Sequence, residues 1–78
     1  MKSSALRKIV GENIRGFRLL RKFSQEKLAV RAKLSQEYIS FVERGIMNIS
    51  VDSLCRISEA LNIEPHLLLT PDASKKSR

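Results

Sequence analysis

Cysteine and histidine are almost missing from this sequence. Cys55 is its one cysteine and His66 its one histidine among 78 residues. A single cysteine excludes an internal disulfide, and these two side chains do not have the spacing of a usual metal site. We therefore expect a protein of a reducing compartment, the cytoplasm, with no metal and no other cofactor. Neither residue is assigned a reaction.

Long apolar runs are also missing. No run approaches the roughly 20 residues that a helix needs to span a bilayer. The first ten residues, MKSSALRKIV, lack the apolar core and the cleavage site of a secretion signal. We expect neither a membrane partner nor a targeting segment.

The residue groups that usually perform catalysis are not evident. The sequence offers no Ser/His/Asp set, no carboxylate pair in an evident cleft and no glycine-rich phosphate loop. So short a chain is also a poor candidate for a deep effector pocket. An enzyme is therefore not expected.

Positive charge is present in excess. Fifteen Lys and Arg face eight Asp and Glu, which gives a net charge of +7. Such a balance points to a polyanionic partner, most often nucleic acid. The alternative is a basic protein whose charge serves only solubility.

Prolines and strand-like alternation are scarce, so the pattern predicts an all-α domain. Seventy-eight residues suffice for one domain, which would bury only about 60% of the surface of its unfolded chain. We expect residues 1–70 to fold, and residues 71–78 to form a disordered basic tail because they lack an apolar anchor. The five predicted helices span residues 5–21, 25–32, 36–44, 51–61 and 65–69.

Apolar residues at helical spacing define the inward faces of these helices. Serines precede three of the helices as N-caps, and Gly45 follows the third as a left-handed C-cap would. The expected caps are Ser24, Ser35 and Ser50. The expected inward residues are Leu6, Val10, Ile14, Phe17, Leu28, Ala29, Ala32, Leu34, Ile39, Val42, Leu54, Ile57, Ala60 and Leu61.

The twenty residues from Gln25 to Arg44 carry the most specific pattern. They hold two short amphipathic helices joined by a tight turn, with the small Ala29 where the helices would touch. This is the geometry of a helix-turn-helix, which places its second helix in a DNA groove.

The outer face of the second of these helices has an unusual composition for a surface helix. An ordinary surface helix would fill this face with Lys and Glu, whereas this one presents Gln36, Glu37, Ser40 and Phe41. Gln bonds adenine, Glu accepts from cytosine, Ser serves either, and Phe can contact a thymine methyl. We interpret this face as base-reading. The alternative is an ordinary surface with one exposed aromatic.

The motifs SQEKLA, LSQEYIS, the ERG stop and SLCRISEAL, taken together, resemble the lambda-repressor-like helix-turn-helix domain of the Cro/CI and Xre repressors. The resemblance covers about Val10 to Leu69. The short length and the NIS segment after the third helix look most like controller proteins of restriction-modification systems.

This resemblance implies roles for individual residues. Gln36, Glu37 and Ser40 match base-contacting positions, and Arg18 and Glu43 match an ion pair between the first and third helices. Gln25, Tyr38, Arg44 and Asn48 match positions that contact the DNA backbone, and Gln25 could also brace Gln36. From charge alone, Arg21 and Lys22 are added as phosphate contacts, along with Lys2, Arg7, Lys8 and Arg15.

Three residues depart from the family pattern. Lys33 stands in the turn where glycine is usual, and a left-handed conformation there would cost roughly 1 kcal/mol. Phe41 is bulky where polar residues are commoner, so it contacts either thymine or a protein. Met47 replaces a residue that is often basic.

A single recognition helix reads too few base pairs to find a site in a genome. We therefore expect a homodimer on a near-palindromic double-stranded operator, with half-sites about 34–36 Å apart. Its interface would use the apolar residues of the fourth and fifth helices, namely Ile63, Leu67, Leu68 and Leu69, with the three leucines divided between interface and core. The alternative is that the fifth helix only closes the core. RNA polymerase is a further candidate partner, if an exposed face reaches it.

The sequence thus predicts a transcriptional regulator, with the controller of a restriction-modification system as the narrower hypothesis. The alternative is an antitoxin-like or adaptor-like module whose third helix binds protein through Phe41. RNA binding is a weaker third hypothesis, because the aromatic platform used for single strands is missing.

Overall fold

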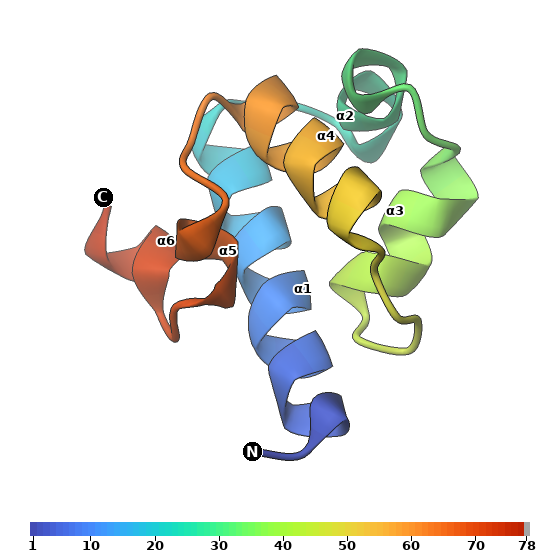
Figure 1. Cartoon of the computed structure of the whole chain (residues 1–78). Helices are drawn as coiled ribbons and strands as arrows, with labels where there is room; N and C mark the ends of the chain where they lie inside the picture. Colours follow the sequence, from blue (N-terminus) through green and yellow to red (C-terminus); the bar gives the residue numbers. More distant parts are fainter. Residues whose placement is uncertain (78) are drawn as a thin grey trace.

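Helices joined by short loops make up the fold (Figure 1). The structure is a computed structural model that describes residues 1–77. In these residues α1 lies between α2 and α3 on one side and α5 and α6 on the other (Figure 1). The helices are α1 (Ser3–Leu20), α2 (Gln25–Ala32), α3 (Gln36–Glu43), α4 (Val51–Leu61), α5 (His66–Leu69) and α6 (Ala73–Lys76). The predicted all-α class is confirmed.

Serine caps begin the three helices that carry or support the helix-turn-helix. The side chains of Ser24, Ser35 and Ser50 each accept a hydrogen bond of 3.0 Å from the backbone N–H three residues later. Each bond satisfies a donor that the first helical turn leaves unpaired. These caps fix where α2, α3 and α4 begin, as the sequence predicted.

Left-handed residues end α2, α3 and α4. Gly45 has φ +73°, which a glycine adopts without a steric penalty. Lys33 also adopts the left-handed conformation, with φ 58° and ψ 44°, and its N–H closes the last turn of α2. The turn of the helix-turn-helix therefore has the geometry usual for glycine but is built on a lysine.

The core lies where α1 meets α2, α3, α4 and α5. Ile14, Leu28, Ile39, Ile57 and Leu61 are 0% exposed. Ala29 is 3% exposed, so the predicted small residue does lie between packed helices. Leu6 was predicted in the same stripe but is 37% exposed, because it lines an open groove on the surface and not the core.

Gly11 lets α1 pack directly on the C-terminal end of α3. A Cβ added there would lie 2.5 Å from the carbonyl oxygen of Val42 and 2.6 Å from that of Glu43. Contacts this short with backbone atoms cannot be relieved by turning a side chain. The glycine therefore sets the distance between α1 and α3.

The prediction of a disordered tail after residue 70 is wrong for residues 71–77. They include α6, and Ala73 and Ser74 are buried against α1. The partner that the sequence did not reveal is Asn13, whose oxygen accepts from the N–H of Ser74 at 3.2 Å. The side-chain amide of Asn13 also donates to the carbonyls of Leu67, Leu68 and Thr70. The five predicted helices thus become six, and Arg78 lies outside the described residues.

Candidate nucleic-acid interface

A shallow groove runs along the exposed side of α3. Its lining combines all four predicted base-contacting residues with two of the predicted backbone contacts. These are Gln25, Gln36, Glu37, Ser40, Phe41 and Arg44. Side chains that the sequence placed together by helical spacing are therefore neighbours on one continuous surface.

The groove offers donors and acceptors at its first turn and apolar area further along. Gln36 and Glu37 are exposed just after the Ser35 cap, so their side chains are free to reach outward. Ser40 and Phe41 are half-buried one turn later. Amide, carboxylate, hydroxyl and aromatic ring in this order can match the edges of bases in a major groove.

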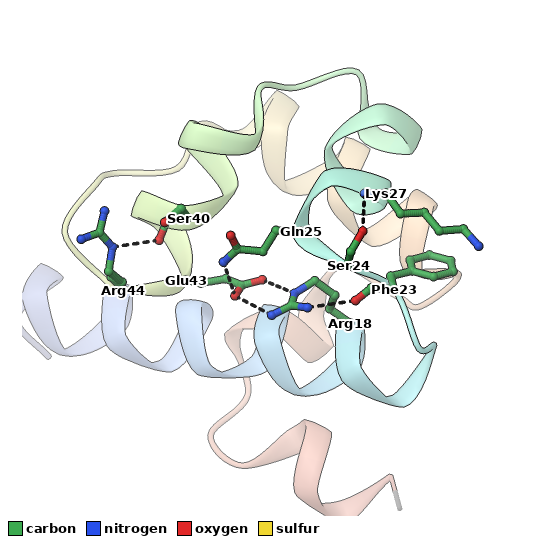
Figure 2. Close-up of polar contacts among 8 residues, drawn as sticks. All are labelled: Arg18, Phe23, Ser24, Gln25, Lys27, Ser40, Glu43 and Arg44. Carbon is green, nitrogen blue, oxygen red and sulfur yellow. Dashed lines mark hydrogen bonds and ion pairs between the residues drawn. The ribbon is translucent and has the colours of Figure 1, made fainter.

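A buried ion pair fixes α3 against α1 behind this groove (Figure 2). The Arg18 guanidinium donates from Nε to Oε2 of Glu43 at 2.7 Å and from Nη2 to Oε1 at 3.1 Å. Its Nη1 donates to the carbonyl of Phe23 at 2.9 Å. The two side chains are 10% and 4% exposed. The fork geometry makes this contact strong and directional.

Gln25 joins this network from the first position of α2. Its amide nitrogen donates to Oε1 of Glu43 at 3.1 Å (Figure 2). One amide hydrogen and the amide oxygen remain for the groove, which Gln25 also lines. The residues that hold α1 to α3 therefore also orient a side chain that lines the groove.

Arg44 follows the last turn of α3 and folds back over the groove. Its guanidinium lies 5.0 Å from the centre of the Phe41 ring. Its Nε donates to the carbonyl of Ser40 at 3.4 Å (Figure 2). Both contacts hold the positive charge beside the residues predicted to contact bases.

The groove does not include the predicted backbone contacts Tyr38, Lys22 and Asn48. Tyr38 is half-buried and packs against the core, and Lys22 is exposed in a left-handed turn after α1. Asn48 is exposed in the loop between α3 and α4.

Arg21, predicted as a phosphate contact, has hydrogen-bond partners within the fold. Its Nε donates to the carbonyl of Leu61 at 2.8 Å, and its Nη2 reaches the carbonyl of Asn62 at 3.5 Å. The carbonyls at the end of a helix lack intrahelical partners and carry partial negative charge. Arg21 therefore caps α4, a partner that charge counting alone could not identify.

Arg7 has a role that sequence reasoning missed. Its Nε donates to the carbonyl of Gly45 at 3.3 Å, and its Nη1 donates to Oδ1 of Asn48 at 3.0 Å. Arg7 thus ties α1 to the loop that follows α3 and uses the side-chain oxygen of Asn48 as an acceptor. No local pattern links residues so far apart in the sequence.

The residues predicted for the dimer interface separate into three environments. Leu68 is 0% exposed in the core, so its assignment to the interface is wrong. Ile63 and Leu67 line one groove, beside Glu59 and Glu64. Leu69 lines a different, mostly apolar groove with Leu6, Val10, Ile49, Val51 and Leu54.

No cluster of three or more His, Cys, Asp or Glu side chains that could hold a metal ion occurs within residues 1–77. Over the same range, no helix is both long and apolar enough to cross a membrane.

Comparisons with known proteins identify the family. A helix-turn-helix family model matches residues 14–68. The control protein C.BamHI of Bacillus amyloliquefaciens is 43% identical over 65 residues, which cover 82% of this chain and 80% of that protein.

Solved structures indicate the same family. A hypothetical transcription factor from Neisseria superposes with a TM-score of 0.86 at 31% identity, over 99% of this chain and 88% of that one. The restriction-modification controller protein C.AhdI from Aeromonas hydrophila superposes with a TM-score of 0.80 at 36% identity, over 82% and 97%. The chain therefore belongs to the helix-turn-helix family of transcriptional regulators.

Proposed function

We propose that this protein regulates transcription by binding a near-palindromic double-stranded operator as a homodimer. The observation that carries the proposal is the groove on α3, where Gln36, Glu37, Ser40 and Phe41 lie side by side on the surface. An α-helix fits the major groove of B-DNA, where each base pair presents a distinct set of donors and acceptors. The proposed base contacts are these four side chains.

The DNA backbone would be held by residues around that groove. Gln25 sits at the N-terminus of α2, where backbone N–H groups and the helix dipole attract phosphate. The further proposed backbone contacts are Lys22, Asn48 and Tyr38. Affinity should fall with salt, by a log–log slope of roughly −0.9 for each phosphate contacted.

The apolar groove around Leu69 supports a dimer interface there. Leu6, Val51 and Leu69 are 37%, 75% and 41% exposed. The groove also contains Asn48, so a second copy seated there would lie beside the loop that follows the proposed recognition helix.

The groove of Ile63 and Leu67 supports a symmetric dimer less well. A two-fold interface places a patch against its own copy. Glu59 and Glu64 in this groove would then face the same acids of the partner, and like charges at an interface repel.

The narrower proposal is that the protein controls a restriction-modification system from the cytoplasm. Its likeness to the control protein C.BamHI and to the controller protein C.AhdI supports this. The operator would then lie before its own gene and a neighbouring restriction-enzyme gene. RNA polymerase would be met through the outer side of α2, where Val30 is 72% exposed.

Footprinting of the DNA that precedes its own gene tests the proposal. We expect protection of two inverted half-sites, and weaker binding to random duplex in gel shifts. Equal affinity for both DNAs would overturn it. If Phe41→Ala instead abolishes capture of a protein partner and leaves DNA affinity unchanged, the protein-interaction alternative holds.

A matched pair of valine variants tests the interface. Val51→Glu puts a charge into the apolar groove, whereas Val30→Glu puts the same charge on a similarly exposed site of α2. Sedimentation should show monomers for Val51→Glu and dimers for Val30→Glu. A dimer that survives Val51→Glu would place the interface elsewhere.

A further inference from the structure

Phe41 and Arg44 form a stacked pair on the reading surface. The guanidinium lies over the ring at 5.0 Å, and both side chains line the groove of α3. Stacking of arginine on an aromatic ring is favourable and limits where the charge can go. The stacking therefore keeps the guanidinium of Arg44 beside the other residues of the groove.

The hydrogen bonds of Arg44 leave the end of its guanidinium available. Its Nε donates to the carbonyl of Ser40, and within residues 1–77 neither Nη makes a hydrogen bond. Two adjacent N–H donors in one plane match O6 and N7 of guanine, which is the commonest specific contact in the major groove. A phosphate contact would not require this placement beside the base-reading residues.

The spacing of the two residues matches neighbouring base pairs. Residues i and i+3 lie on one helix face, about 4.5 Å apart along the axis. Successive bases of a strand are about 3.4 Å apart. If Phe41 contacts a thymine methyl, the guanidinium held over its ring reaches the adjacent pair.

We infer that Phe41 and Arg44 act as one unit that reads a thymine next to a guanine in each half-site. This inference rests on the proposed function and makes it more specific. Arg44 then reads a base, whereas the family resemblance assigned it to the backbone. Phe41 has two roles, since it contacts the methyl group and positions Arg44.

Base analogues in a selected operator test the inference. Deoxyuridine in place of the thymine removes only the methyl group, and 7-deazaguanine in place of the guanine removes only the N7 acceptor. For the wild-type dimer we expect about fourfold weaker binding with deoxyuridine, from one lost methyl contact. We expect at least about fivefold weaker binding with 7-deazaguanine.

The variants test whether the pair acts together. Arg44→Ala should lose its sensitivity to 7-deazaguanine but keep that to deoxyuridine. Phe41→Leu keeps an apolar side chain without the ring, so it should stay sensitive to deoxyuridine and lose most of its sensitivity to 7-deazaguanine. If Phe41→Leu remains fully sensitive to 7-deazaguanine, the ring of Phe41 does not position Arg44 and the coupling is contradicted.

Arg44→Lys separates base reading from phosphate binding. Lysine keeps the charge but loses the planar fork. We expect Arg44→Lys to lose about 5- to 150-fold in affinity for the operator and to keep its affinity for random duplex. If lysine restores full operator affinity, and Arg44→Ala weakens all duplexes equally with a salt slope smaller by about 1, Arg44 is a phosphate contact and the inference is wrong.

Failure of the inference is distinguishable from failure of the proposed function. A wild-type protein that prefers its operator but ignores both analogues would overturn only the reading unit. A wild-type protein that shows no preference among duplexes would overturn the proposed function as well.

Discussion

Ile39 and Glu37 stand two residues apart on α3, yet Ile39 is 0% exposed while Glu37 lies on the surface. Ile39 and Val42 face the core, and Gln36, Glu37 and Ser40 line the outer groove. One helix of eight residues therefore carries the contacts that fold the protein and those proposed to read DNA. Substitutions on one face should therefore change folding or DNA binding without changing the other.

Glu43 is where the two faces are joined. Its carboxylate accepts hydrogen bonds from Arg18 of α1 and from Gln25 in the groove on α3. Changes on the inner face should therefore reduce stability, changes on the outer face should reduce recognition, and changes at Glu43 should reduce both.

The largest effect should come from breaking the buried ion pair. Arg18→Ala leaves the Glu43 carboxylate, 4% exposed, without its charged partner. Removal of one member of a buried pair costs about 3–5 kcal/mol. Urea unfolding should show this loss. The double variant Arg18→Met with Glu43→Leu should be close to the wild type in stability, and a similar loss in the double variant would contradict the account.

The next largest effect should come from the inner face. Ile39→Ala removes a side chain that is 0% exposed and leaves a cavity among packed helices. Such changes cost about 2–5 kcal/mol. Thermal unfolding measures the loss, with Val30→Ala on the exposed side of α2 as the control. A change below about 0.5 kcal/mol for Ile39→Ala would show that this face is not the core.

A smaller and different effect is expected on the outer face. Gln36→Ala should weaken binding to the operator by about 1–3 kcal/mol, because a good bidentate base contact contributes that much discrimination. Its unfolding free energy should stay within about 0.5 kcal/mol, since the side chain is exposed. Parallel titration and unfolding experiments check both. A loss of stability without a loss of affinity would reverse the assignment of the faces.

The smallest effect is expected at the turn between α2 and α3. Lys33→Gly should stabilise the protein by up to about 1 kcal/mol, because glycine adopts the left-handed conformation without the Cβ penalty. Lys8→Gly makes the same substitution inside α1 and should destabilise by about 1 kcal/mol. Equal destabilisation by both would mean that the turn stores no strain in solution.

Local patterns made much of the fold predictable. The caps at Ser24, Ser35 and Ser50 act on residues three positions away, so the sequence shows both partners. The inward positions of α2 and α3 follow helical spacing, which also gathered the groove residues. The sequence identified Lys33 as the residue that a left-handed turn would strain. It did not determine that the turn is left-handed.

Contacts between distant residues were not predictable. Asn13 reaches Ser74, Arg21 reaches Leu61, and Arg7 reaches Asn48. Each of these side chains has several polar partners available, and only the packed helices select one. The same packing decides that Leu68 is buried while Leu69, its neighbour, is 41% exposed.

Selection of bound sequences from a random duplex pool measures whether the outer face of α3 reads DNA. The outer face of α3 should enrich two inverted half-sites whose centres are about 34–36 Å apart. Gln36→Ala should relax the sequence at one position of each half-site and leave the spacing unchanged. A wild-type pool without an enriched sequence, or one that Gln36→Ala leaves unaltered, would contradict the claim that this face reads DNA.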